Sequence, residues 1–327
     1  MQPERHKVLL FQRTIRVYRD AIFQRLYKSL GVVVCHSPSL AQQGKQVADD
    51  VARTDRVALP GRFLRGNSGP STQAVLPVLL KYRPRVVIAQ FSFGVLTFWK
   101  LLLLKPLFRY KLIPWSHGIK NEEVLRNRDS LRTLVVLLVY RNSDAILFYS
   151  IMRQQRLLKE RQSLLRKSFV AYNTLDTQKL FSISEEMRAA SVMYSNHECK
   201  AGSSFNIVYL GRLLPDKRVD LLVSAWELLQ QKYDLGLIII GGGPEQKQIA
   251  SIENRPNVIC TGTLHNVKDV GEYLIKSDIM IMPGYVGLSI VHGFAFGLPM
   301  ITCRSTENGP FHSPEIEYLK DGYNGFF

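Results

Sequence analysis

Short apolar runs rich in β-branched residues alternate with longer helical stretches along almost the whole chain. Residues 31–36 and 85–90 are two such runs in the first half, and the alternation restarts after residue 204 with residues 206–210 and 235–240. This order predicts parallel sheets joined by helical crossovers. We therefore expect an α/β fold of two successive doubly wound, Rossmann-like domains that face a cleft.

The length of 327 residues suits about two domains of ordinary size. The alternation is lost in a polar stretch that ends in Lys200-Ala201-Gly202-Ser203-Ser204. We place an N-terminal domain at residues 1–190, a linker at 191–204 and a C-terminal domain at 205–327. Helices are expected, among other places, at residues 152–167, 216–233, 244–253 and 267–276.

Charge is distributed unevenly along the chain, whose formal net charge is +16. Residues 1–196 hold 32 basic and 13 acidic residues, or +19, whereas residues 197–327 hold 11 and 14, or −3. This excess predicts an anionic partner for the first half, such as a membrane surface or a phosphorylated substrate. A solvated basic face is the alternative. No nucleic-acid recognition motif is present, so we expect no nucleic-acid partner.

Cysteine spacing and hydropathy restrict the cellular context. The four cysteines form no Cys-x-x-Cys pair, which argues against a metal site or a disulfide framework and suits a reducing cytosol. Residues 279–303 lack a formal charge, but their prolines and glycines punctuate short elements, so we interpret them as strand, loop, helix and strand rather than a membrane span. Residues 91–108 form either a buried core helix or a helix that lies on a membrane surface.

Two loops that follow predicted strands could bind a nucleotide, since ligands of such sheets bind beyond the carboxyl ends of the strands. In residues 211–217, Arg212 and Lys217 flank a helix start and could converge on a diphosphate. Ordinary surface cations are the alternative. Gly241 and Gly243 follow the next strand and indicate either a close backbone approach to a nucleotide or a structural tight turn.

A third loop and one histidine of the first half complete the candidates. Gly287, Leu288 and Ser289 could present main-chain N–H groups to the same anion, and His292 could reach a sugar hydroxyl. A structural role for His292 is the alternative. His117 directly follows the predicted strand at 111–116 and could donate a hydrogen bond or act as a base.

Several motifs of the second half occur in a characteristic order and spacing. They are Asn206-Ile207-Val208-Tyr209-Leu210-Gly211-Arg212 with Lys217, Gly241-Gly242-Gly243-Pro244-Glu245, Asn257-Val258-Ile259-Cys260-Thr261-Gly262 and Tyr172-Asn173-Thr174-Leu175-Asp176. Through these motifs, about residues 170–327 resemble the donor-binding domain of the family 4 retaining, nucleotide-sugar-dependent glycosyltransferases (glycosyl transferases group 1), which have the GT-B fold.

The resemblance implies transfer of a sugar from a nucleoside diphosphate sugar to an acceptor hydroxyl, with retention and without a metal or another cofactor. It implies that the first domain is the acceptor side and that the second binds the donor. The implied catalytic residues are His117, Arg212 and Lys217. The implied donor-binding residues are Arg212, Lys217, Gly241, Gly243, Gly287, Leu288, Ser289, His292 and Glu315.

The sequence departs from the family pattern at three places. Two glutamates of that pattern are replaced by Gly284 and His292, and Glu315 could supply the missing carboxylate. The loop at residues 13–18 lacks the glycine pair that many members have. The chain stops at Phe327, within a segment that relatives continue, so we expect an incomplete C-terminal domain.

Together these features lead us to expect a cytoplasmic enzyme of the bacterial surface-polysaccharide type, peripheral at the inner face of the cell membrane. Its acceptor would be lipid-linked or a growing glycan, and its partners the nucleotide-sugar donor and an anionic membrane surface. A sugar-nucleotide epimerase or phosphorylase of the same fold remains open, as does a non-catalytic nucleotide-binding subunit.

Overall fold

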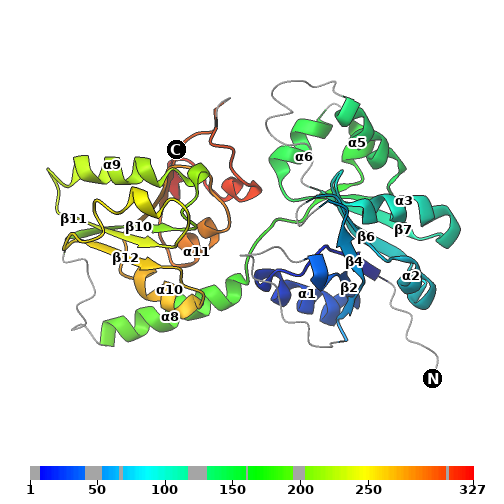
Figure 1. Ribbon diagram of the computed structural model, residues 1–327, viewed down its shortest axis with the longest axis horizontal. Helices are drawn as coiled ribbons and strands as arrows, with labels where there is room; N and C mark the ends of the chain where they lie inside the picture. The colour runs from blue at the N-terminus through cyan, green and yellow to red at the C-terminus, as the bar shows by residue number, and fades with distance from the viewer. Residues whose placement is uncertain are drawn as a thin grey trace. The chain divides into compact units, whose positions relative to one another are not determined.

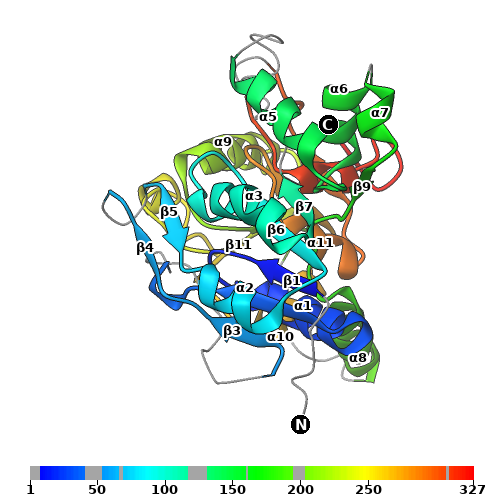
Figure 2. The ribbon, with the colours of Figure 1, turned by 90° about the vertical axis from the view of Figure 1, so that its right-hand side faces the viewer.

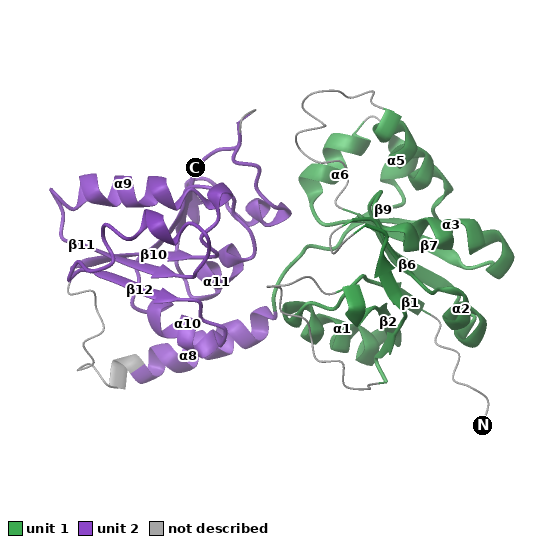
Figure 3. Ribbon diagram, viewed as in Figure 1, with its two compact units in different colours: residues 1–175 green, residues 176–327 purple. Residues whose placement is uncertain are grey.

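The computed structural model describes residues 8–40, 54–65, 69–116, 131–159, 161–193, 203–306 and 309–327. The chain divides into unit 1, residues 1–175, and unit 2, residues 176–327 (Figure 3). Each unit is built around its own parallel sheet. The α/β fold with two doubly wound units is therefore confirmed, whereas the cleft stays a prediction.

Unit 1 contains a sheet whose described strands follow the order β3-β2-β1-β6-β7-β8-β9, all parallel. The chain order reverses at β1, so the loops after β1 and β6 flank the topological switch point. The strands are β1 (Val8–Phe11), β2 (Val32–His36), β3 (Arg56–Ala58), β6 (Val86–Phe91), β7 (Lys111–Ser116), β8 (Ile146–Phe148) and β9 (Ser168–Val170). A short antiparallel pair joins β4 (Gly61–Phe63) and β5 (Ser71–Gln73).

Helices cover both faces of this sheet because successive strand residues point to opposite sides. Leu9 and Phe11 join a core with α2, α3 and α5, whereas Leu10 joins a core with Phe23 of α1. Figure 2 shows α3 beside β6 and β7. The helices are α1 (Val17–Leu30), α2 (Leu76–Tyr82), α3 (Leu96–Phe108), α5 (Leu131–Asn142), α6 (Ile151–Leu158) and α7 (Gln162–Leu165).

Unit 2 contains a second parallel sheet, in which the described strands follow the order β12-β11-β10-β13-β14-β15. Its strands are β10 (Phe205–Leu210), β11 (Leu235–Ile240), β12 (Val258–Gly262), β13 (Ile279–Met282), β14 (Met300–Thr302) and β15 (Gly325–Phe326). Helix α9 (Val219–Leu229) lies on one face, and α10 (Val267–Leu274) with α8 (Thr177–Met193) on the other (Figure 1). Helix α11 (Ser289–Ala295) also packs against α8.

The observed division precedes the predicted domain boundary at residue 190. Helix α8 belongs to unit 2 because it packs on α10 and α11, and Arg188 donates a hydrogen bond to the Phe296 carbonyl. Residues 194–202, most of the predicted linker, lie outside the described residues.

Three predicted helices differ from the structure. Residues 152–167 contain two helices, α6 and α7. The helix predicted at residues 244–253 is wrong: this segment forms turns and a short 3₁₀ helix, η3 (Gln246–Gln248), because its start is tied to the β10 loop by Glu245 N–H to Leu213 O. The helix predicted at 216–233 is interrupted at Arg218, whose φ is 51°.

The pattern at residues 279–303 is confirmed as β13, a loop, α11 and β14. Within the described part of the chain, no helix combines the length and the apolar character that crossing a membrane requires.

Candidate functional site

The site lies at the switch point of the unit 2 sheet, where β10 has β11 and β13 as neighbours. The loop after β10 contains the 3₁₀ helix η2 (Pro215–Lys217), and it contacts the loop after β13 directly. Gly284 N–H donates to Lys217 O at 3.1 Å, and Tyr285 N–H donates to Asp216 O at 2.7 Å. These two carbonyls would be acceptors in a continuous helix, which explains the interruption at Arg218. Because of this contact, helix α9 begins only after Arg218, and its N-terminus lies at the carboxyl edge of the sheet.

Lys217 is the central cation of this site. Its Nζ donates a hydrogen bond of 2.6 Å to the carbonyl of Tyr285 and lies 4.7 Å from the centre of the Tyr285 ring. The pKa of Lys217 is lowered to about 8, mainly by burial and also by repulsion from Arg212, against the opposite effects of Asp216 and Glu315. An anion placed here would relieve the unfavourable burial of the charge.

Arg212 follows β10 and exposes its side chain. Its main chain is held by Tyr209, whose hydroxyl donates to Arg212 O at 3.1 Å, while the adjacent Leu213 is buried. The structure thus brings Arg212 and Lys217 into electrostatic reach of each other, whereas their convergence on a diphosphate stays a prediction.

Gly241 and Gly243 allow the loop after β11 to contact the loop after β10. Their φ values are 146° and 157°. A Cβ on Gly241 would lie 1.9 Å from Gly211 O, and one on Gly243 would lie 2.3 Å from Leu213 O. Both glycines therefore have a structural role in the described chain, which was one of the two readings open from the sequence.

Gly284 occupies a position that has no room for any side chain. A Cβ there would lie 2.3 Å from Asp216 O and 2.6 Å from Lys217 O. The glutamate that the family pattern places here is thus incompatible with the observed contact between the two loops.

Glu315 lies in the 3₁₀ helix η4 (Pro314–Tyr318) and is only 3% exposed. Its carboxylate is close enough to Lys217 to raise the pKa of that amine. The structure therefore places the Glu315 carboxylate within electrostatic reach of Lys217, although the two residues are far apart in sequence.

Gly287, Leu288 and Ser289 lead into α11. In the described chain, the main-chain N–H groups of Gly287 and Leu288 donate no hydrogen bond, as is usual at a helix start. The Ser289 hydroxyl donates to the sulfur of Met282 at 2.9 Å. These residues present free donors beside the β13 end, although their role toward a ligand stays a prediction.

His292 lies within α11, and its Nδ1 is buried without a hydrogen-bond partner among the described residues. Burial lowers its pKa to about 4, so the ring is neutral near pH 7. A neutral imidazole can exchange hydrogen bonds with a hydroxyl group.

His312 is a site residue whose role the sequence did not indicate. Its Nδ1 accepts from Val286 N–H at 3.1 Å, so the neutral ring carries its proton on Nε2, which contacts Cys303 O at 2.8 Å. Burial lowers the pKa of His312, and Lys217 lowers it further. This histidine fixes the loop after β13 against the segment that carries Glu315.

His117 lies outside the described residues, so its predicted role stays a prediction. The described residues include no group of three or more His, Cys, Asp or Glu side chains that could hold a metal ion.

Comparisons with known proteins show which family and which folds this chain resembles. Residues 204–326 match the family model described as Glycosyl transferases group 1, which confirms the resemblance over this part of the chain. An uncharacterized glycosyltransferase of Haemophilus influenzae is 28% identical over 122 residues, which are 36% of this chain and 34% of the relative. One of Methanocaldococcus jannaschii is 22% identical over 252 residues, 73% of this chain and 60% of the relative. The chain thus covers about a third and three fifths of these relatives.

Solved structures similar to this chain extend over both units. A glycosyltransferase from Rickettsia africae aligns with a TM-score of 0.63 at 14% identity, covering 99% of this chain and 84% of that one. Anabaena HepE, in complex with UDP and glucose, aligns at 0.60 and 15%, covering 98% and 85%. The lipopolysaccharide outer core galactosyltransferase WaaB aligns at 0.60 and 13%, also covering 98% and 85%. At these identities the likeness shows the fold, and the GT-B fold is confirmed.

Proposed function

We propose that the chain is a retaining glycosyltransferase that moves a sugar from a nucleoside diphosphate sugar to a lipid-linked or polysaccharide acceptor. The observation that carries the proposal is Lys217, a partly buried ammonium held by the Tyr285 carbonyl, within electrostatic reach of Arg212, at the switch point of unit 2. The family match over residues 204–326, the two relatives named glycosyltransferases and the UDP in the HepE complex support it.

The loops after β10 and β13 would bind the diphosphate of the donor. Negative charge develops on this group as the bond to the sugar breaks, and Arg212 and Lys217 would stabilise it. The N–H groups of Gly287 and Leu288 are donors for a second set of phosphate oxygens. His292, neutral near pH 7, would contact the ribose.

Sugar recognition would use a carboxylate from a different segment than the family pattern provides. Gly284 leaves no room for a side chain, whereas Glu315 is buried within electrostatic reach of Lys217. We assign to Glu315 the orientation of Lys217 and contact with the transferred sugar. His117 would contact the sugar from unit 1, and the leaving phosphate would accept the proton of the acceptor hydroxyl.

A cytoplasmic location at the inner face of the cell membrane is part of the proposal. Exposed leucines follow helical spacing on α3 and α5: Leu103 and Leu107 are 79% and 72% exposed, and Leu131 is 77% exposed. Isolated exposed leucines are common, but α3 has two and the neighbouring α5 has three, Leu134 and Leu138 being the other two, and this favours an apolar partner.

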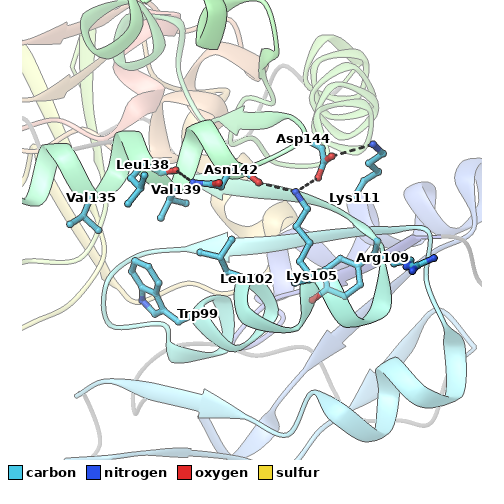
Figure 4. A pocket seen from close by; sticks show the side chains of 12 residues that line it. Trp99, Leu102, Lys105, Arg109, Lys111, Val135, Leu138, Val139, Asn142 and Asp144 are labelled. Atoms are coloured by element: carbon cyan, nitrogen blue, oxygen red, sulfur yellow. Dashed lines mark hydrogen bonds and ion pairs between the residues drawn. The ribbon is translucent and has the colours of Figure 1, made fainter.

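A cavity of about 640 Å³ lies between these helices (Figure 4). Its apolar end is formed by residues such as Trp99 and Leu138. At its other end, Lys105 and Lys111 pair with a single carboxylate, Asp144, at 2.8 and 3.3 Å. Apolar surface beside an excess of cations suits an anionic lipid surface.

Transfer can be tested with radiolabelled UDP-, GDP- and ADP-sugars and a bacterial membrane extract as acceptor source. We expect label to enter the lipid or polysaccharide fraction, and Lys217→Ala to abolish this. Lys247→Ala, which removes an exposed lysine of the same unit, is the matched control and should retain transfer. The absence of both transfer and donor hydrolysis with every donor would overturn the proposal. Conversion of a nucleotide sugar without the extract would indicate an epimerase.

Membrane association can be tested separately by flotation with vesicles of phosphatidylglycerol and phosphatidylethanolamine. We expect the protein to float with these vesicles and the Leu103→Ser, Leu107→Ser double variant to remain at the bottom. Leu228→Ser changes a 68% exposed leucine of α9 in unit 2 and should float like the unaltered protein. Equal flotation of all variants would contradict the assignment to α3 and α5.

A further inference from the structure

Three arginines follow β1 at the switch point of the unit 1 sheet. Arg13 and Arg16 lie in the loop between β1 and α1, and Arg19 lies in the first turn of α1. The loops at such a position are where doubly wound sheets bind ligands. The loop at residues 13–18 contains no glycine, so it presents side chains at this position.

Arg19 is held by groups from four different strand ends. Its guanidinium donates to the Gln12 side-chain oxygen at 3.5 Å, to the Tyr149 hydroxyl at 3.3 Å and to the Asn173 side-chain oxygen at 2.8 Å. It also lies 5.5 Å from the centre of the Trp115 ring, which stacks on Tyr149 at 5.2 Å. The arginine therefore has a fixed position beyond the carboxyl edge of the sheet.

Around Arg19, three buried donors have no acceptor among the described residues. They are Nε2 of Gln12, Nε1 of Trp115 and one terminal guanidinium nitrogen of Arg16. Gln12 is 4% exposed and Trp115 is 8% exposed. Buried polar groups are nearly always hydrogen-bonded, and a site at which all the unsatisfied atoms are donors calls for a ligand made of acceptors.

The local charge supports the same conclusion. No carboxylate of the described chain pairs with Arg13, Arg16 or Arg19, and Asp20 instead pairs with Arg56. Burial lowers the pKa of Arg13 and of Arg16, and Arg16 is further affected by repulsion from the other two arginines, against an opposite effect of Tyr18. Clustered cations with unsatisfied donors fit an anion with several oxygens.

We propose that Gln12, Arg13, Arg16, Arg19 and Trp115 form a binding site for a phosphate or diphosphate group in unit 1. Two sources can carry this group: a lipid-linked acceptor, or the sugar nucleotide itself. The assignment to an acceptor rests on the proposed function, whereas binding of inorganic diphosphate does not depend on it.

The first test is calorimetric titration with inorganic diphosphate in an Arg212→Ala background, which removes a cation of the unit 2 site. In this background, we expect Arg16→Gln to bind diphosphate about tenfold to a hundredfold more weakly than the protein that carries Arg212→Ala alone. Lys28→Gln removes an exposed charge from the last turn of the same helix and should bind as the background protein does. Equal affinity of the Arg16→Gln and Lys28→Gln proteins would overturn the proposal.

The source of the group is decided by titrating farnesyl diphosphate and UDP into proteins with Arg212 intact. Loss of farnesyl diphosphate binding in Arg16→Gln, with UDP binding retained, assigns the site to a lipid-linked acceptor. Loss of UDP binding alone supports the site and assigns it to the donor. If sugar transfer is never observed but Arg16→Gln still loses diphosphate, the proposed function fails and this site stands.

Two further readouts separate a ligand site from a structural role. Arg16→Gln removes a cation without a counter-ion, so the ligand-free protein should melt at an equal or higher temperature than the wild type. Trp115→Phe keeps the ring against Tyr149 but removes the N–H donor, so diphosphate binding should weaken by up to about tenfold without loss of folding. A lower melting temperature of Arg16→Gln, with unchanged diphosphate binding, would show a structural role and overturn the proposal.

Discussion

The amine of Lys217 donates a hydrogen bond of 2.6 Å to the main-chain carbonyl of Tyr285. This bond joins the loop after β10 to the loop after β13, so the residue proposed to bind the leaving diphosphate also holds the two loops together. Its ammonium is buried enough to lower its pKa to about 8. The position and the protonation of one side chain therefore both decide whether the site can bind an anion.

Donor binding should depend on pH through Lys217. Because the diphosphate binds the protonated amine, we expect the dissociation constant for UDP to increase above pH 8, by at most about tenfold per pH unit. Lys217→Arg keeps its charge across this range and should bind with little pH dependence. Calorimetric titration with UDP from pH 6.5 to 9.5 measures the pH profiles of the wild type and of Lys217→Arg, and equal profiles would contradict the role of Lys217.

The stability of the ligand-free protein should change in the opposite sense. Its free energy of unfolding should increase from pH 8 to about 10, because the unfolded chain binds more protons over this range.

Glu315→Gln should shift that pH profile. The carboxylate of Glu315 raises the pKa of Lys217, so removing its charge should lower this pKa and move the midpoint of the UDP-binding profile to lower pH. Glu317→Gln in the same 3₁₀ helix is the matched control, because its carboxylate is not among the groups that shift Lys217. A midpoint that moves equally in both variants would count against the proximity of Glu315.

Gly284→Ala should destabilise the protein and weaken donor binding. Its Cβ would overlap main-chain atoms of Asp216 and Lys217, and overpacking of this kind costs about 1–3 kcal/mol. Gly287→Ala, whose Cβ would lie 3.5 Å from the Tyr285 ring, should unfold close to the wild-type urea midpoint. Equal midpoints for the two variants would show that the loop contact is not required.

His292 should make stability sensitive to acid. Its pKa is about 4 in the folded chain and about 6.5 when unfolded, so the unfolded state binds more protons between these values. The stabilisation is complete above pH 6.5 and decreases as the pH falls toward 4, by at most about 3 kcal/mol. Urea unfolding of His292→Asn should therefore show a smaller decrease over this range than the wild type, and an identical decrease would contradict this role.

Local patterns in the sequence predicted most strands and several helices correctly. Leu237-Ile238-Ile239-Ile240 is apolar without alternation and is buried on both faces of the unit 2 sheet as part of β11. On α9, Val219, Leu222, Val223 and Trp226 are buried as their helical spacing predicted, although Leu229 is 42% exposed. These properties depend on neighbouring residues, so they can be recognised from the sequence.

Other features were missed because distant segments decide them. The helix predicted from Asp216 is interrupted since Gly284 and Tyr285 bind the carbonyls that it would have used. Helix α8 belongs to unit 2 because of its packing partners, not because of its own sequence.

Local sequence patterns were enough to predict the α/β class, the two-unit organisation and the loop that carries Arg212 and Lys217. Turn residues and hydrophobic periodicity are local signals, and they place this loop at the carboxyl end of a strand. Contact between the β10 and β13 loops, and the placement of Glu315 within electrostatic reach of Lys217, exist only in the folded chain. The same is true of Arg16 and Trp115, which lie around Arg19 with donors unsatisfied among the described residues. Strand order in a sheet is set by long-range pairing, which brings together residues whose separation along the chain contains no sign of their contact.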